Sequence, residues 1–118
     1  MIDSILRIMT WNANGLRQRC CELEVFLHDN HIDIALISET HFTDKDHYKI
    51  VGYQAYWTTH PSGAAWGGTA ILVKGTIKHS LQQEIREEYF QSTIISITYN
   101  NKETNIGAVY CPPRHKIS

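Results

Sequence analysis

The spacing of apolar positions changes twice in the first third of this 118-residue chain. Residues 5–11 are mostly apolar and end before the turn signal formed by Asn14 and Gly15. Residues 17–29 carry apolar side chains at helical spacing with charged residues between them, which predicts an amphipathic helix. Residues 32–38 hold an unbroken apolar run, which is typical of a strand covered on both faces. The predicted unit is β-α-β, with two parallel strands and a right-handed crossover.

The rest of the chain shows the pattern of mainly antiparallel strands. Its predicted elements are strands at residues 51–57, 69–73, 93–99 and 104–110, and a short helical turn at residues 81–88. The polar residues 100–102 separate the last two strands and predict a hairpin. We find no repeat and no linker, so residues 1–118 are expected to form one domain.

The charge of the chain is nearly balanced, with a formal net charge of -1. A near-neutral chain lacks the broad positive surface that binds nucleic acid without help. DNA binding would therefore depend on a bound cation or on individual basic residues. These are Arg17, Arg19, Lys74, Lys78, Arg114 and Lys116.

The cysteines and the apolar runs indicate the compartment. Cys20, Cys21 and Cys111 are odd in number and lack the paired spacing of a zinc site. They predict reduced thiols rather than a disulfide framework. No apolar run reaches the length needed to cross a membrane. We expect an intracellular protein, in nucleus and cytoplasm, with no membrane partner.

Oxygen-bearing side chains follow three of the predicted strands. Asn12 and Asn14 come after the first strand, Glu39 after the second, and Tyr110 ends the last. Strand ends of this kind can deliver such groups to one rim of an α/β sheet. A carboxylate is a Mg²⁺ ligand, and amides can bind a cation or a phosphate. Each residue taken alone also has a plainer explanation: a solvated carboxylate, an Asn-Gly turn, or a buried aromatic ring.

Four segments together make the pattern specific. They are Thr-Trp-Asn-Ala-Asn-Gly-Leu at 10–16, Ile-Ser-Glu-Thr-His at 37–41, Gly-Gly-Thr-Ala-Ile-Leu-Val at 67–73 and Val-Tyr-Cys-Pro-Pro at 109–113. In this order they resemble the N-terminal half of the endonuclease/exonuclease/phosphatase superfamily. Within it they resemble the endonuclease domain of jockey-like non-LTR retrotransposon polyproteins. The resemblance implies an α/β fold, half of a four-layer sandwich that stops before its second half.

The resemblance also implies an activity and roles for the residues. The activity is Mg²⁺-dependent (or Mn²⁺-dependent) hydrolysis of a DNA phosphodiester, which nicks the target DNA and primes a downstream reverse transcriptase domain. Glu39 falls on the family's metal ligand. Asn14 stands where many relatives carry an aspartate near the metal. Asn12 and Tyr110 fall on groups that bind and orient the phosphate, so Asn12, Glu39 and Tyr110 are the expected catalytic residues.

Two motifs of the superfamily are missing. They are an Asp-x-Asn pair and a Ser-Asp-His motif, which hold the water-activating aspartate and the catalytic histidine. No aspartate follows Asp46, and His115 lies in a different context. We therefore expect a partial domain that is inactive alone, holds metal weakly, and self-associates through an uncovered sheet face. Two alternatives stay open: a non-catalytic interaction or weak DNA-binding remnant, and an abasic-site nuclease or phosphatase of the same superfamily.

Overall fold

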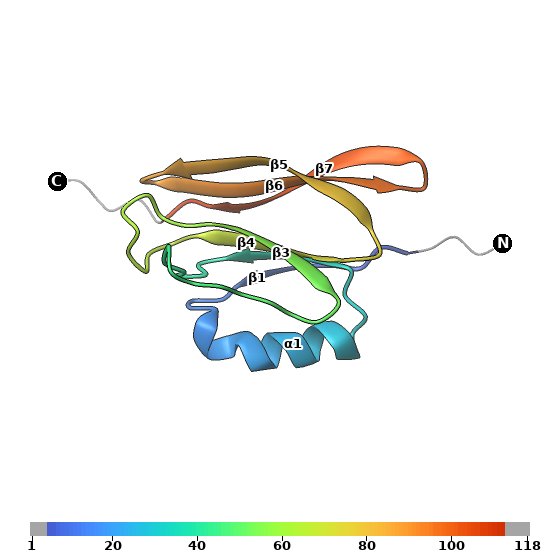
Figure 1. Cartoon of the computed structure of the whole chain (residues 1–118), viewed down its shortest axis with the longest axis horizontal. Coiled ribbons are helices and arrows are strands. Elements are labelled where there is room, and N and C mark those ends of the chain that lie inside the picture. The colour runs from blue at the N-terminus through green and yellow to red at the C-terminus, as the bar shows by residue number, and fades with distance from the viewer. Residues whose placement is uncertain (1–4, 113–118) are drawn as a thin grey trace.

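A computed structural model describes residues 5–112 of the chain. Its elements in chain order are β1 (Ile8–Asn12), a 3-10 turn η1 (Arg17–Arg19), α1 (Cys20–Asp29), β2 (Ile34–Ser38), β3 (Tyr53–Thr58), β4 (Thr69–Lys74), β5 (Lys78–Glu87), β6 (Phe90–Tyr99) and β7 (Lys102–Tyr110). They form three layers, in which α1 lies on one side, a first sheet in the middle and a second sheet on the other side (Figure 1).

The first sheet contains the predicted β-α-β unit. Its strand order is β1-β2-β4-β3, and β1 runs parallel to β2, while β4 is antiparallel to both of its neighbours. Helix α1 makes the crossover and buries Leu23 and Leu27 against Ala35 and Ile37 of β2. The helical spacing of apolar residues in α1 gives it this one apolar face, and the prediction is confirmed.

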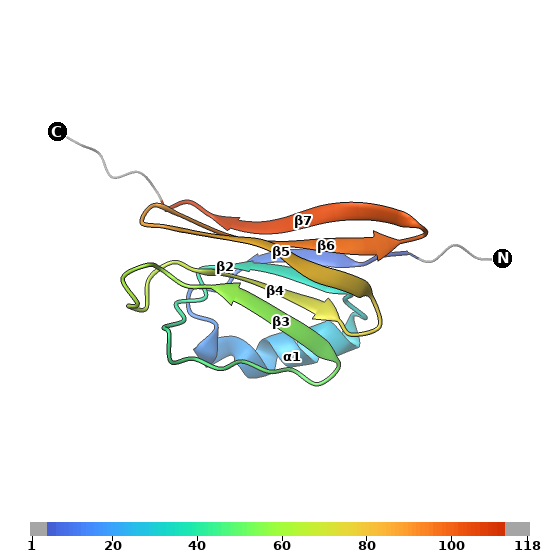
Figure 2. The ribbon, with the colours of Figure 1, turned by 45° about the horizontal axis from the view of Figure 1, so that its top comes forward.

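The second sheet covers the other face of the first (Figure 2). It has the antiparallel order β5-β6-β7, and Ile95 and Ile97 of β6 pack with Ile34 and Ile71 of the first sheet. The expectation of an uncovered inner face is therefore wrong, because the chain supplies strands of both sheets. What stays open is the outer side of the second sheet, where β5 and β7 are mostly exposed.

The helical turn expected at residues 81–88 is also wrong. Residues 78–87 form β5, which pairs with β6 along its length and carries one irregularity between Leu81 and Gln83. The Gln, Glu and Arg residues of this segment are good helix formers. Propensity is a weak preference, however, and β6 offers a continuous row of backbone partners that overrides it.

The predicted hairpin between the last two strands is confirmed. β6 and β7 pair from Gln91 opposite Tyr110 to Tyr99 opposite Lys102. Asn100 and Asn101 at the turn have φ angles of 51° and 64°, and asparagine tolerates this left-handed conformation better than most residues. Within residues 5–112, no helix is both long and apolar enough to cross a bilayer.

Candidate functional site

The carboxyl ends of β1 and β2 lie side by side, and their pairing continues beyond the strands. Asn12 is opposite Ser38 in the parallel register. Past that point the Ala13 N–H donates to the Ser38 carbonyl, and the Gly15 N–H donates to the Glu39 carbonyl, both at 2.9 Å. The segment with the two asparagines therefore runs next to the segment with Glu39, as predicted for parallel strand ends.

Asn12 closes a local turn with its own side chain. Its Oδ1 accepts the N–H of Asn14 at 3.1 Å, and Asn14 itself has a φ of 46°. This is an Asx turn, which the Asn-x-Asn-Gly sequence favours. The amide nitrogen of the exposed Asn12 side chain remains available as a donor.

Glu39 sits on an unusual backbone. Glu39 and His41 have φ angles of 55° and 56°, a left-handed region that few residues other than glycine adopt. The His41 N–H donates to the Gly67 carbonyl at 2.9 Å, which ties this segment to the turn before β4. The Glu39 side chain is 22% exposed, and its Oε1 lies 3.7 Å from Nε2 of His41. Strained conformations of this kind are held only where the surroundings fix them, and they concentrate at functional sites.

Tyr110, at the end of β7, meets Glu39 across the gap between the sheets. Burial raises the pKa of the Tyr110 phenol, and the negative charge of the nearby Glu39 carboxylate raises this pKa further. The Tyr110 ring also lies against Gly67, where an added Cβ would come within 3.0 Å of two ring carbons. Gly67 thus allows a close backbone approach, and it does not form a phosphate loop.

The structure therefore places all four predicted residues at one end of the molecule. Tyr110 packs against Gly67, whose carbonyl holds the His41 N–H, and this brings the phenol close to the Glu39 segment. Asn12 and Asn14 are held next to Glu39 by backbone pairing. Whether these residues bind metal or phosphate stays a prediction.

The sequence did not reveal a buried polar network beneath this rim. Thr58, Thr69 and Thr93 are almost fully buried, and the Thr93 hydroxyl oxygen lies 2.8 Å from that of Thr58 and 2.9 Å from that of Thr69. Gln91, also on β6, is fully buried beside them. Threonine at the same end of three strands is the available signal, but it becomes visible only when the register between the sheets is known.

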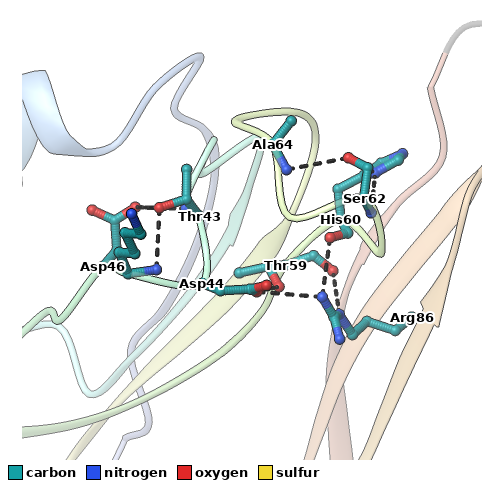
Figure 3. Close-up of polar contacts among 9 residues, drawn as sticks. Thr43, Asp44, Asp46, Thr59, His60, Ser62, Ala64 and Arg86 are labelled. Carbon is teal, nitrogen blue, oxygen red and sulfur yellow. Dashed lines mark hydrogen bonds and ion pairs between the residues drawn. The ribbon is translucent and has the colours of Figure 1, made fainter.

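The loops around this end are fastened by Arg86 of β5 (Figure 3). Arg86 donates to the carbonyls of Thr59 and His60 at 3.1 and 3.2 Å, and it pairs with Asp44 at 3.3 Å. Asp44 also accepts from the Thr59 hydroxyl at 3.0 Å. These contacts join the loop after β2 to the loop after β3, so Arg86 has a structural role in holding the two loops together.

Two of the basic residues on which any DNA binding would depend are paired with acids. Arg17 forms an ion pair with Asp46, and Lys74 lies 3.5 Å from Asp33. Arg114 and Lys116 lie outside the described residues, as does His115. Any phosphate contact by Arg17 or Lys74 would compete with these carboxylates.

The donor set fits part of a Mg²⁺ shell. Within the described part of the chain, no group of three or more His, Cys, Asp or Glu side chains could enclose a metal. Mg²⁺ needs fewer protein ligands than that, since it is usually held by one or two carboxylates together with water and phosphate oxygens. Glu39 supplies one carboxylate, and the exposed Asn14 carries an amide oxygen nearby in the fold.

Comparison with known proteins identifies sequence relatives of the chain. No family model matches the chain. The probable RNA-directed DNA polymerase from transposon X-element of Drosophila melanogaster is 39% identical over 110 residues, which are 92% of this chain and 12% of that protein. The RNA-directed DNA polymerase from mobile element jockey of the same species is 34% identical over 116 residues, which are 98% of this chain and 13% of that protein. The chain thus spans only a small part of the length of these relatives.

Solved structures share the fold. The endonuclease domain of TRAS1, a telomere-specific non-LTR retrotransposon, matches with a TM-score of 0.67 at 18% identity, over 90% of this chain and 44% of that one. The catalytic domain of APE2 from Xenopus laevis matches with a TM-score of 0.66 at 19% identity, over 92% of this chain and 46% of that one. The chain shares its fold with these nuclease domains of the endonuclease/exonuclease/phosphatase type. Its sequence relatives are RNA-directed DNA polymerases of mobile elements, jockey among them, and the resemblance read from the four segments is confirmed.

Proposed function

We propose that this chain is the N-terminal portion of a Mg²⁺-dependent DNA endonuclease that nicks target DNA during retrotransposition. The observation that carries the proposal is that Tyr110 packs against the Gly67 turn, which holds the Glu39 segment, beside the segment that holds Asn12. The relatives, named as RNA-directed DNA polymerases of mobile elements, support a downstream reverse transcriptase domain as partner. The proposed location is nuclear and cytoplasmic, and the nucleus is the compartment that holds the target DNA.

Each residue has a separate part in this proposal. Glu39, with the Asn14 amide oxygen, would hold the cation, which when bound neutralises charge on the phosphate. The free amide of Asn12 donates to a phosphate oxygen. Tyr110 donates its phenol proton to another oxygen, and its raised pKa keeps that proton in place at neutral pH.

In this proposal the chain alone does not hydrolyse DNA. No aspartate follows Asp46, so the chain lacks the aspartate that the resemblance assigns to water activation. Groups that act as a unit fail together, and loss of the general base should remove nearly all hydrolysis. Mg²⁺ would bind weakly for a related reason, since the shell has one carboxylate.

A Mg²⁺ titration followed by NMR tests the proposed site. The amides of Asn12, Asn14 and Glu39 should shift as Mg²⁺ is added, and Glu39→Gln should abolish the shifts. Glu103→Gln is the matched control, because Glu103 is exposed near the start of β7, at the far end from Tyr110. Shifts that are absent, or that survive Glu39→Gln, would overturn the proposal.

A nicking assay tests the predicted inactivity. Supercoiled DNA incubated with Mg²⁺ and the 118-residue chain should stay intact. Mg²⁺-dependent nicking that disappears in Glu39→Gln would instead show that the chain has a complete active site.

A second candidate function is supported by the open edge of the sandwich. Among the described strands, β1 pairs only with β2 and β7 only with β6. A groove of about 260 Å³ runs between these edges and is lined in part by Trp11, Leu36 and Val109. Unpaired edge strands readily accept another strand, which favours an interaction module. Concentration-dependent sedimentation would support self-association, and a steep salt dependence of DNA binding would support the nucleic-acid form of this candidate.

The third candidate is a repair nuclease or a phosphatase of the same superfamily. The likeness to APE2 is one of fold, whereas the sequence relatives at 34% and 39% identity belong to mobile elements. This difference supports the retrotransposon assignment.

A further inference from the structure

We infer that Gln91 is a positioning residue for the site, an inference that rests on the proposed function of Glu39 and Tyr110. Its side-chain amide fixes the turn formed by Gly67 and Gly68. The Gly67–Gly68 turn then holds the backbone conformation of Glu39 and the position of the Tyr110 ring.

Gln91 links the two sheets through both ends of its amide. The side chain is 0% exposed. Its Oε1 accepts the N–H of Gly68, just before β4, at 3.0 Å. Its Nε2 donates to the carbonyl of Glu87, at the end of β5. An apolar replacement would leave the buried Gly68 N–H without its acceptor, and unpaired buried groups are costly.

The turn that Gln91 holds carries the segment around Glu39. The Gly67 carbonyl accepts the His41 N–H at 2.9 Å, and the Gly68 carbonyl accepts the Thr40 N–H at 3.4 Å. These two bonds flank the left-handed backbone of Glu39 and His41. A shift of the turn would therefore release the conformation that presents the Glu39 carboxylate.

The same turn packs against Tyr110. A Cβ added at Gly67 would lie 2.5 Å from Gln91 Oε1 and 3.0 Å from the Tyr110 ring, so the three residues are in close contact. Gln91 also stands opposite Arg86 on β5 and Tyr110 on β7 in the sheet register. The buried Gln91 amide thus contacts the turn that supports both Glu39 and Tyr110.

Native-state hydrogen exchange of the metal-free chain tests this role in Gln91→Met. The readout is the exchange rate of the His41 amide divided by that of the Leu72 amide in β4, which removes changes in global stability. Loss of one hydrogen bond predicts an increase of about fivefold in this ratio. Thr93→Val is the matched control: it removes a buried hydroxyl on the same inward face of β6 and should leave the ratio unchanged.

Gln91→Glu provides a conservative variant if Gln91→Met does not fold. Burial favours the protonated acid, which can accept from Gly68 and donate to Glu87 as the amide does. At about pH 5 the His41 ratio should match the wild type, and it should rise once the acid ionises. An unchanged ratio in the Gln91 variants at every pH, or an equal rise in Thr93→Val, would overturn the inference. Because no metal is present, a changed ratio supports the positioning role even if the Mg²⁺ titration fails and the proposed function falls.

Discussion

The two sheets of this molecule differ in how they are covered. The first lies between α1 and the second sheet, and the residues of β4 at 70–73 are completely buried. The second sheet is covered on its inner side only, and Val109 on its edge strand β7 is 52% exposed. The first sheet is therefore buried on both faces, whereas the second contributes one apolar face and an edge that stays accessible.

The largest expected effect comes from the layer between the sheets. Ile71→Ala removes a side chain that is 0% exposed and packs with Ile34 and Ile95. It should lower the free energy of unfolding by about 3 kcal/mol, measured by urea denaturation. Val109→Ala on the open side is the control and should change it by no more than about 0.5 kcal/mol. Equal losses would show that the two sides are not covered differently.

The buried threonine network should give an intermediate effect. Thr93→Val keeps the shape of the side chain but removes the hydroxyl that joins Thr58 and Thr69. We expect a loss of about 1–2 kcal/mol in the same denaturation assay. Thr98→Val on the same strand is the control and should be within about 0.5 kcal/mol of the wild type. A Thr93 variant as stable as the Thr98 variant would mean that the network adds nothing.

The smallest effect is expected at Tyr48, on the loop that packs beside α1. Its hydroxyl is buried and has no hydrogen-bond partner among the described residues, so Tyr48→Phe should cost almost nothing at neutral pH. Thermal unfolding at pH 7 measures this effect. A clear loss of stability would point to a partner for this hydroxyl.

The same variant should change the response to alkali. Burial, followed by the charges of Cys20 and Glu24, raises the pKa of Tyr48 above its ordinary value of 10. The unfolded state then releases its proton first, so the stability from neutral Tyr48 is complete below pH 10 and is lost as the pH rises toward the folded pKa. Tyr48→Phe should therefore lose less stability above pH 10 than the wild type does.

The sequence predicted the parts of the fold that depend on local pattern. The β-α-β unit follows from the buried run at residues 32–38 and the helical spacing before it, and the hairpin follows from Asn100 and Asn101. β5 was missed because its pairing with β6 overrides the helical preference of its own residues. The uncovered inner face was wrong because the sequence does not show which sheet a strand joins.

The candidate site also has a part that the sequence predicts and a part that only the stacking of the two sheets reveals. Asn12, Asn14 and Glu39 could be placed together from the sequence, because parallel strands end at the same edge. The contact between Glu39 and Tyr110 and the hold of Gln91 on the turn depend on how two sheets are stacked. No spacing along the chain carries that information.

The proposed site depends most on the closeness of Glu39 to Tyr110. Its most direct test is the pKa of the Tyr110 phenol, followed by NMR of ¹³C-labelled tyrosine in the wild type and in Glu39→Gln. We expect a lower pKa in the variant, because the substitution removes the negative charge that raises it. An identical pKa in both proteins would show that the carboxylate and the phenol do not share a site.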